Sequence, residues 1–356
     1  MKKLLLVDLG LAWGGQEIYS RSIAQALIER GWSVTCLSSH RRHEISGANF
    51  IPCQIGYKNF IDTAQIIFNV AKINNIVHFN GIRAIYLSAL LPHKMPFIGT
   101  KHLPYSSLEH KTAKAHVARF ASNFAFRNID WLISISSQTL DELPRNIQKR
   151  SSVVLNGVED MGPPALAEFN SATLTVCFVG RFVEHKGLLR LLSAINKIHS
   201  QGTDVRLLIA GGGPLESEAR AFVDMLKLPH IVKFLGYVEL PGEIYRQCHL
   251  CVLPSLHEGL PLSLLEAMSA GCALLGHDIP GVRDVIRHEV NGLIADISPD
   301  SLASALKRLD ADRPLLARLR KNALDDYDLN WRLDRMVDET EAIYRRVIDA
   351  KAMDKQ

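Results

Sequence analysis

Short apolar runs recur along the chain, and most of them end in glycine or polar residues before an amphipathic segment begins. Such runs are typical of buried strands, and the amphipathic segments are typical of helices. They predict strands at 4–8, 34–38, 76–79, 97–100, 131–135, 153–155, 175–179, 205–210, 231–235, 250–254, 273–275 and 293–295. Because helical segments such as 17–30 and 188–199 separate the strands, the pattern predicts an α/β protein with parallel sheets.

This alternation breaks once, between residues 159 and 172, where Gly162, Pro163 and Pro164 stand in a stretch with little pattern. Such a composition is typical of a linker between domains. We therefore expect two doubly wound, Rossmann-like domains facing a cleft, at 1–158 and 173–330. An amphipathic helix from 331 to about 351 follows, and its apolar face can pack on either half.

The stretch 257–271, which reads H-E-G-L-P-L-S-L-L-E-A-M-S-A-G, predicts a loop that turns into a helix. Pro261 suits the first helical position, where its missing N–H costs nothing, and Gly271 is placed to end the helix. Glu258 and Gly259 then lie in the loop, beside the free N–H groups of the helix start. Because those groups add to the positive end of the helix dipole, we expect an anion site here.

Two carboxylates flank this expected anion site. Glu266 follows Pro261 by about five residues, roughly 7–8 Å along the helix axis. Its carboxylate can accept hydrogen bonds from two adjacent hydroxyls, such as those of a ribose. Glu258 would face whatever lies beyond the phosphates, so the stretch has the shape of a nucleotide-sugar site. The alternative is an ordinary amphipathic helix with two solvated glutamates.

Polar residues follow other predicted strands of the second half. Arg181 and Lys186 come after the strand at 175–179, and the glycine run 211–213 comes after the strand at 205–210. The carboxyl ends of parallel strands form one edge of a sheet, where ligands bind. Two cations and a helix start suit a diphosphate. Because the cations can neutralise a leaving diphosphate, we expect no metal ion.

The first half offers weaker signals. Gly14 and Gly15 stand between a predicted strand and helix, without the G-x-G-x-x-G pattern of dinucleotide sites. The pair either lets the backbone approach an anion or simply makes a tight turn. His102 follows the strand at 97–100, which makes it a candidate binding residue, although a lone histidine is more often structural.

Composition narrows the class of protein. The chain has 356 residues, 47% hydrophobic and 22% charged, as in a globular protein. Its net charge of +4 is too small to imply nucleic acid. Residues 101–150 contain eight Lys/Arg and four Asp/Glu, and a predicted helix at 106–128 mixes basic residues with phenylalanines. That helix is either a membrane-surface helix or a packed helix with a solvated basic face.

Other patterns argue against membrane-spanning, disulfide and metal classes. No apolar run approaches the ~20 residues that span a bilayer, and Asp8 interrupts the apolar start before a signal peptide pattern develops. We therefore expect a cytoplasmic protein. Six scattered cysteines include Cys248-x-x-Cys251 without a second pair, so we expect buried thiols. Asp310-x-Asp312 lies in a charged helix–turn region and is expected at the surface.

At these residues the chain resembles glycosyltransferase family 4, the retaining, nucleotide-sugar-dependent transferases of GT-B fold. The most specific part of the resemblance is Glu258 and Glu266 with seven residues between them. It covers nearly the whole chain. Further motifs support it in the right order: Gly14-Gly15-Gln16-Glu17, His102, Asn156-Gly157-Val158, Gly180-Arg181, Lys186-Gly187 and Gly211-Gly212-Gly213-Pro214.

The resemblance implies roles for individual residues. Arg181 and Lys186 would hold the donor diphosphate, Glu258 the transferred sugar and Glu266 the ribose, while His102 would line the acceptor side. The implied catalytic residues are Arg181, Lys186, Glu258 and His102. The implied donor contacts are Gly14, Gly15, Gly180, Gly211, Gly259, Leu260, Pro261, Leu262 and Glu266. The last helix would cross back to the first domain, which would comprise 1–158 and about 331–356.

The implied function is that of a retaining, metal-independent, hexosyltransferase-type enzyme with no cofactor besides its co-substrate. It would move a sugar from a UDP- or GDP-sugar to a glycan or glycolipid in bacterial lipopolysaccharide, capsule or other surface-glycan assembly. Three positions depart from the family pattern: Asn80 replaces a histidine, Glu159 an aspartate and Asn330 a Ser/Thr. The alternatives are an epimerase or phosphorylase of the same fold, and a non-catalytic nucleotide-sugar-binding subunit. Peripheral attachment to the inner membrane through the basic segment is a further expectation.

Overall fold

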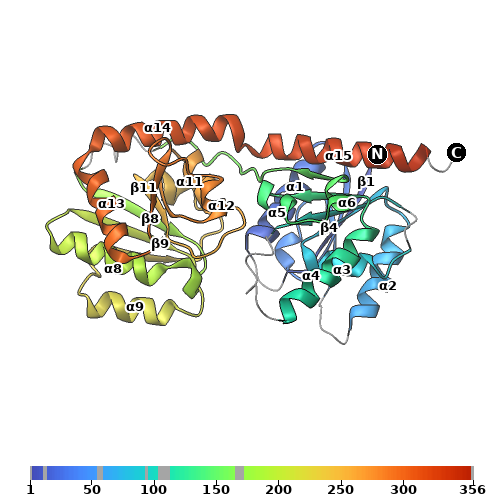
Figure 1. The fold of residues 1–356 in the computed structure, drawn as a ribbon, viewed down its shortest axis with the longest axis horizontal. Coiled ribbons are helices and arrows are strands. Elements are labelled where there is room, and N and C mark those ends of the chain that lie inside the picture. Colours follow the sequence, from blue (N-terminus) through green and yellow to red (C-terminus); the bar gives the residue numbers. More distant parts are fainter. Residues whose placement is uncertain are drawn as a thin grey trace. The chain divides into compact units, whose positions relative to one another are not determined.

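The computed structural model describes residues 2–10, 14–53, 59–92, 95–102, 113–164 and 172–353. The chain divides into two compact units (Figure 1). Unit 1 comprises Met1–Asn156 and Leu333–Gln356, and unit 2 comprises Gly157–Arg332. No helix among the described residues is long and apolar enough to cross a membrane.

Unit 1 contains a parallel seven-stranded sheet in the order β3-β2-β1-β4-β5-β6-β7. Its strands are β1 (Lys3–Asp8), β2 (Ser33–Ser38), β3 (Ala48–Pro52), β4 (Ile76–Asn80), β5 (Phe97–Lys101), β6 (Trp131–Ser134) and β7 (Ser151–Val153). Its helices are α1 (Gly15–Glu29), α2 (Phe60–Ala71), α3 (Ile82–Ser88), α4 (Ala113–Ala125), α5 (Ser137–Asp141), α6 (Arg145–Gln148) and α15 (Leu333–Met353). Its described residues also form the short 3₁₀ turns η1 (Arg41–His43) and η4 (Phe126–Asn128).

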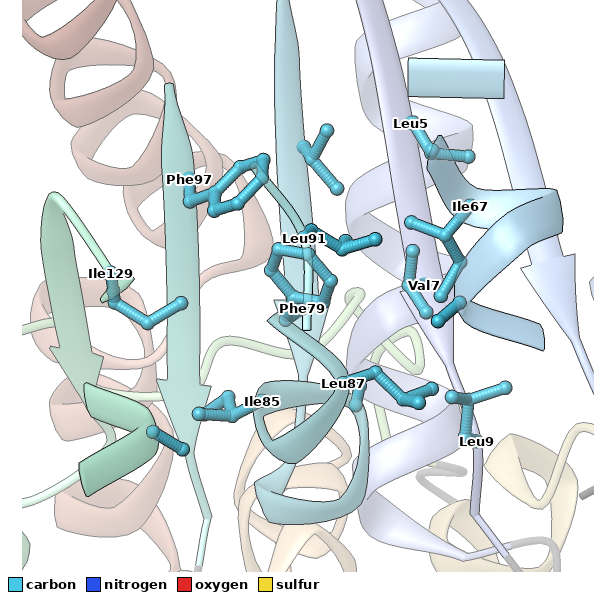
Figure 2. Close-up of a cluster of buried hydrophobic side chains, with 14 of the residues drawn as sticks. Leu5, Val7, Leu9, Ile67, Phe79, Ile85, Leu87, Leu91, Phe97 and Ile129 are labelled. Atoms are coloured by element: carbon cyan, nitrogen blue, oxygen red, sulfur yellow. The ribbon is translucent and has the colours of Figure 1, made fainter. Parts of the chain in front are cut away.

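Both faces of this sheet are covered by apolar side chains. Along β1, Leu5 and Val7 belong to the core shared with α2, α3 and α4, which Figure 2 shows, while Leu4 and Leu6 belong to the core shared with α1 and α15. Because successive strand residues point to opposite faces, one apolar run fills both cores. This is why the strands read as continuous apolar runs, and it makes the unit doubly wound.

Unit 2 repeats the architecture with a parallel six-stranded sheet in the order β10-β9-β8-β11-β12-β13. Its strands are β8 (Leu174–Val179), β9 (Val205–Ala210), β10 (Val232–Gly236), β11 (Leu250–Leu253), β12 (Ala273–His277) and β13 (Gly292–Ala295). Its helices are α8 (Leu188–Ser200), α9 (Glu216–Met225), α10 (Gly242–Arg246), α11 (Leu262–Ser269), α12 (Pro280–Arg283), α13 (Pro299–Ala311) and α14 (Arg313–Asn330), with the 3₁₀ turn η5 (Glu184–Lys186). The expected pair of doubly wound α/β units is confirmed.

The sequence patterns missed or misplaced elements at the rim of unit 1. The edge strand β3 alternates between partly buried and exposed residues, so no apolar run marks it. The strand expected at 153–155 is observed at Ser151–Val153, where two serines and half-burial hide the signal. Helices α2 and α3 were also not anticipated. Of the helix expected at 106–128, α4 is described, and residues 106–112 lie outside the described residues.

The last helix, α15, belongs to unit 1. Its buried Met336, Val337 and Tyr344 join the core formed with α1. Tyr344 also bonds to His78 on β4, at 2.5 Å between its hydroxyl and Nδ1. Trp32 donates its indole N–H to Glu341 at 3.0 Å. The sequence pattern left two places open for this helix, and these contacts decide between them.

Candidate active site

The carboxyl edge of the unit 2 sheet gathers the loops that follow β8, β9 and β11. Lys186 lies in η5, after β8, and Glu258 lies in the loop after β11. The Lys186 Nζ donates to Glu258 Oε1 at 2.6 Å, and the two side chains are only 18% and 9% exposed. The backbone joins the same loops, since Leu256 N–H donates to the His185 carbonyl at 2.7 Å. Two residues that sequence reasoning placed in separate roles are therefore direct partners.

Helix α11 begins beside this pair. It starts at Leu262 with Pro261 as its N-cap, one residue later than expected. No side chain caps it, and the Leu264 N–H donates to the Pro261 carbonyl at 3.0 Å, so the N–H groups of Leu262 and Ser263 are the ones that can bind an anion. At the other end Gly271 adopts φ +74°, and its N–H and that of Cys272 bond back to Met268 and Ala267. The predicted glycine stop is confirmed.

Glu266 lies inside α11 and is 9% exposed. Its Oε2 accepts a hydrogen bond from the Tyr245 hydroxyl at 2.9 Å. Burial raises the pKa of the Glu266 carboxyl, and the bond from Tyr245 partly opposes that shift. Because Glu258 and Glu266 are both largely buried, the alternative of two solvated glutamates is wrong. The sequence analysis did not identify Tyr245, because no motif around it in the chain indicates a binding residue.

Glycines fix the backbone around this edge. At Gly211, φ is +134°, and a Cβ would lie 1.9 Å from the Gly180 carbonyl oxygen. Gly213 has φ +153°, and its Cβ would lie within 3.0 Å of the Phe182 backbone. Gly212 has room, with its nearest neighbour 3.6 Å away. Positions 211 and 213 thus need glycine because the segments that follow β8 and β9 lie so close to each other, whatever ligand binds there.

Gly281 was not anticipated as part of the site. It lies in α12, and a Cβ there would come within 2.6 Å of the carbonyl oxygens of Glu258 and Gly259. The start of α12 therefore packs directly against the loop that carries Glu258. Arg181 is exposed in the loop after β8. Leu260, Pro261 and Leu262 are buried at the start of α11.

The carboxyl edge of the unit 1 sheet contains a second group of predicted residues. His102 follows β5, and its Nε2 lies 2.7 Å from Oδ1 of Asn80, the last residue of β4. Asn80 in turn donates to Asp8, the last residue of β1, at 2.8 Å. Burial lowers the pKa of His102 to about 4, while the charge of Asp8 opposes the shift. His102 is therefore a neutral imidazole at neutral pH.

Gly14 and Gly15 mark the start of α1 in unit 1. Gly14 is the N-cap in an extended conformation, and among the described residues a Cβ there would meet no atom closer than 3.6 Å. The local backbone therefore does not itself require glycine at 14. Residues 11–13 lie outside the described residues.

The six cysteines and the Asp310-x-Asp312 pair lie where the sequence predicts them, in the core and in a helix–turn region respectively. All six cysteines are buried free thiols. Asp312 is the N-cap of α14 and accepts from the Leu315 N–H at 2.9 Å, while Asp310 pairs with Arg313. Within the part of the chain that the structure describes, no group of three or more His, Cys, Asp or Glu side chains is arranged to hold a metal ion.

Comparison with known proteins agrees with the two halves of the fold. Residues 13–160 match the model of Glycosyltransferase Family 4, and residues 167–326 match that of Glycosyl transferases group 1. An uncharacterized glycosyltransferase of Methanocaldococcus jannaschii is 23% identical over 93% of this chain and 94% of its own. The chain therefore belongs to the GT4-type glycosyltransferases, and it is an enzyme of that class.

Two further proteins give the comparison more detail. The structure of Anabaena HepE in complex with UDP and glucose superimposes with a TM-score of 0.82 at 18% identity, covering 96% of this chain and 99% of that one. This likeness shows the GT-B fold. The N-acetylgalactosamine-N,N'-diacetylbacillosaminyl-diphospho-undecaprenol 4-alpha-N-acetylgalactosaminyltransferase of Campylobacter jejuni is 25% identical over 58% of each chain.

Proposed function

We propose that this protein is a retaining, hexosyltransferase-type enzyme that transfers a sugar from a UDP- or GDP-sugar to a hydroxyl of a glycan or glycolipid. The observation that carries the proposal is the grouping of Lys186, Glu258 and the start of α11 at one sheet edge, with Glu266 buried behind them. HepE, of the same fold, has been crystallised with UDP and glucose. The Campylobacter relative acts on a lipid-linked diphosphate acceptor, as its name states.

In this proposal each group acts on one part of the donor. The diphosphate binds the N–H groups at the start of α11 together with Arg181 and Lys186, which neutralise the charge that grows as the sugar departs. The ribose hydroxyls bind Glu266. Glu258 contacts the transferred sugar. Arg181 and Lys186 supply the positive charge that a metal ion supplies in other transferases, so the reaction is metal-independent.

The surrounding pathway is also part of the proposal. The glycan that the transfer extends is a surface glycan of the lipopolysaccharide or capsule type. The enzyme works on the cytoplasmic face of the inner membrane. Phe120 and Phe124 of α4 are 77% and 57% exposed, beside the exposed Arg119 and Arg127. An exposed mixture of aromatic and basic side chains suits contact with an anionic bilayer.

The test is a screen of nucleoside diphosphates and their sugars, first by thermal shift and then by turnover. A ligand at 100 times its dissociation constant should stabilise the protein by about 2.7 kcal/mol. The proposal expects one base and one sugar to stand out, and expects turnover to persist in excess chelator. A protein that binds the donor without turning it over would instead be a binding subunit. Activity restored only by magnesium or manganese would contradict metal independence.

A further inference from the structure

Three residues at the carboxyl edge of the unit 1 sheet form a buried chain of hydrogen bonds. Asp8, Asn80 and His102 follow one another across the neighbouring strands β1, β4 and β5, and they are 1%, 0% and 8% exposed. The distances are 2.8 Å from Asn80 Nδ2 to Asp8 Oδ2 and 2.7 Å from Asn80 Oδ1 to His102 Nε2. Each residue has its position fixed by its neighbours.

The partners of Asn80 determine which way its amide faces. One end of the amide lies 2.8 Å from Asp8 Oδ2 and 3.0 Å from the Gln16 carbonyl oxygen. A carboxylate and a backbone carbonyl only accept hydrogen bonds, so the group that faces both must be the NH₂. Asp8 Oδ1 also accepts from Gln16 Nε2 at 3.1 Å and from the Gly10 N–H at 3.3 Å. The amide oxygen of Asn80 therefore faces His102.

This orientation fixes the tautomer of His102. An amide oxygen only accepts hydrogen bonds, so the nitrogen of His102 that faces it, Nε2, must carry the proton. Burial lowers the pKa of His102 to about 4, so the ring carries a single proton at neutral pH. With that proton on Nε2, the other nitrogen, Nδ1, holds a lone pair. No described residue hydrogen-bonds to Nδ1.

We propose that Asn80 is a positioning residue for transfer, because it holds His102 as the Nε2–H tautomer whose Nδ1 accepts the hydrogen bond of the acceptor hydroxyl. The proposal rests on the transferase function proposed above. It also gives a physical role to the position where the chain departs from its family pattern. Asn80 itself touches no substrate in this scheme and acts only through His102.

The first experiment reads the tautomer directly, without substrate or variant. Selectively ¹⁵N-labelled histidine gives separate chemical shifts for protonated and unprotonated ring nitrogens, and the His102 signals are assigned by their loss in His102→Gln. The expected spectrum at pH 7 shows a protonated Nε2 and an unprotonated Nδ1. An Nδ1–H tautomer or an imidazolium at pH 7 would overturn the proposal, whatever the enzyme's activity.

The second experiment compares two replacements of Asn80 by activity and by the same spectrum. Asn80→Leu keeps the size but removes the oxygen that faces Nε2. Its turnover should fall on the order of tenfold or more, because the His102 imidazole would no longer be held in position for the acceptor hydroxyl. Asn80→Asp retains an oxygen that can accept from Nε2. Its carboxyl group can also share one proton with that of Asp8, which retains the hydrogen bond to β1. It should keep the Nε2–H tautomer and most of the turnover.

Two controls separate the possible failures. Ser88→Ala removes another buried hydrogen bond of unit 1, since Ser88 Oγ donates to the Ile85 carbonyl at 2.7 Å within α3, and it should leave His102 and turnover unchanged. Affinity for the nucleoside diphosphate should stay within about twofold in every variant, because that site lies in unit 2. Equal activity of Asn80→Leu and wild type would refute the positioning role while leaving the transferase intact. A wild type without transferase activity would refute the proposed function, and the spectrum would still report the tautomer.

Discussion

At the scale of single residues, the donor edge of unit 2 depends on pairs rather than on isolated groups. Lys186 and Glu258 are 2.6 Å apart, and Tyr245 and Glu266 are 2.9 Å apart. A residue with such a partner cannot be changed alone without leaving a partly buried polar group unpaired. Each variant here therefore needs its own measure of stability besides its kinetic constants.

Lys186→Ala should lose mainly turnover. In the proposed mechanism its ammonium group is needed most when charge grows on the departing diphosphate, and interactions of that kind raise kcat. The expected loss is roughly 10²–10³-fold, as for one preorganised electrostatic donor. The measurement is kcat and KM with the correct donor sugar. Glu258→Gln serves as the matched variant, since it breaks the same ion pair from the other side. A Lys186→Ala enzyme that turns over like wild type would refute the assignment.

Glu266→Gln should chiefly weaken nucleotide binding. The ribose is bound alike before and during transfer, so loss of its contact with Glu266 affects affinity rather than kcat. A charge-assisted hydrogen bond of this kind is worth on the order of 1–3 kcal/mol. Calorimetry with the nucleoside diphosphate measures the change directly. Ser269→Ala, one turn further along α11, is the control and should bind normally. Unchanged affinity in Glu266→Gln would argue against a ribose at this position.

At the scale of elements, the segments that follow neighbouring parallel strands approach so closely that backbone contacts limit which residues fit. This is clearest after β9, where Gly211 and Gly213 combine positive φ with contacts to neighbouring backbone, and Gly212 has neither. Of three identical residues in the sequence, the first and third are therefore constrained to glycine by the backbone, and the middle one is not.

Alanine substitutions in this glycine run should differ sharply in their effect on stability. Gly211→Ala should lower the melting temperature, because its Cβ would meet the Gly180 carbonyl oxygen and its backbone would be strained. The loss should be on the order of 1–3 kcal/mol or more. Gly212→Ala should melt like wild type. If Gly212→Ala keeps its stability but loses donor binding, a ligand approaches the backbone there. Equal melting temperatures for both variants would contradict the geometry.

The free energy of unfolding should depend on pH through two buried histidines of unit 1. His78 bonds to Tyr344 of α15, and burial lowers the pKa of His78 to about 3, as it lowers that of His102 to about 4. In the unfolded chain these histidines take up protons near pH 6.5, whereas in the folded chain they stay neutral until the pH is much lower. The free energy of unfolding therefore falls as pH decreases below 6.5. The loss should be about 2 kcal/mol per histidine between pH 7 and pH 5.

Urea unfolding at pH 7 and pH 5 measures this dependence. His78→Gln, which cannot take up a proton, should show a smaller difference between the two pH values than wild type. An equal difference in both proteins would mean that His78 is not the group that resists protonation.

At the scale of the whole molecule, its surface charge and exposed apolar residues bear on where the enzyme works. Phe120 and Phe124 lie one helical turn apart on α4, beside Arg119. Lys111, from the same basic segment, lies outside the described residues. The described part of α4 thus retains both features that favour the membrane-surface alternative.

Sedimentation with anionic vesicles tests that alternative. Arg119→Glu with Arg127→Glu should weaken binding at low salt, by about 1 kcal/mol for each basic group removed, and high salt should weaken the wild type in the same way. Arg206→Glu with Lys233→Glu, on exposed positions of unit 2, is the matched reversal and should change binding less. If wild type does not bind at low salt, peripheral attachment through α4 is wrong.

Much of the fold follows from the sequence alone. Continuous apolar runs predict the buried parallel strands, because a strand covered on both faces needs apolar residues at every position. The signals at the ends of α11 are equally local, since proline and glycine restrict their own backbone angles. These patterns also place Arg181, Lys186, Glu258 and Glu266 after strand ends, where a parallel sheet gathers its ligand-binding loops.

Tertiary structure decided what local patterns cannot contain. The unit that holds α15, the pairing of Lys186 with Glu258, the bond from Tyr245 to Glu266 and the chain from Asp8 through Asn80 to His102 all join residues far apart in sequence. A residue's own neighbours in the chain report whether it is buried, but not which partner meets it. That partner depends on strand order and on close approaches such as the one at Gly281, which exist only once the sheet has formed.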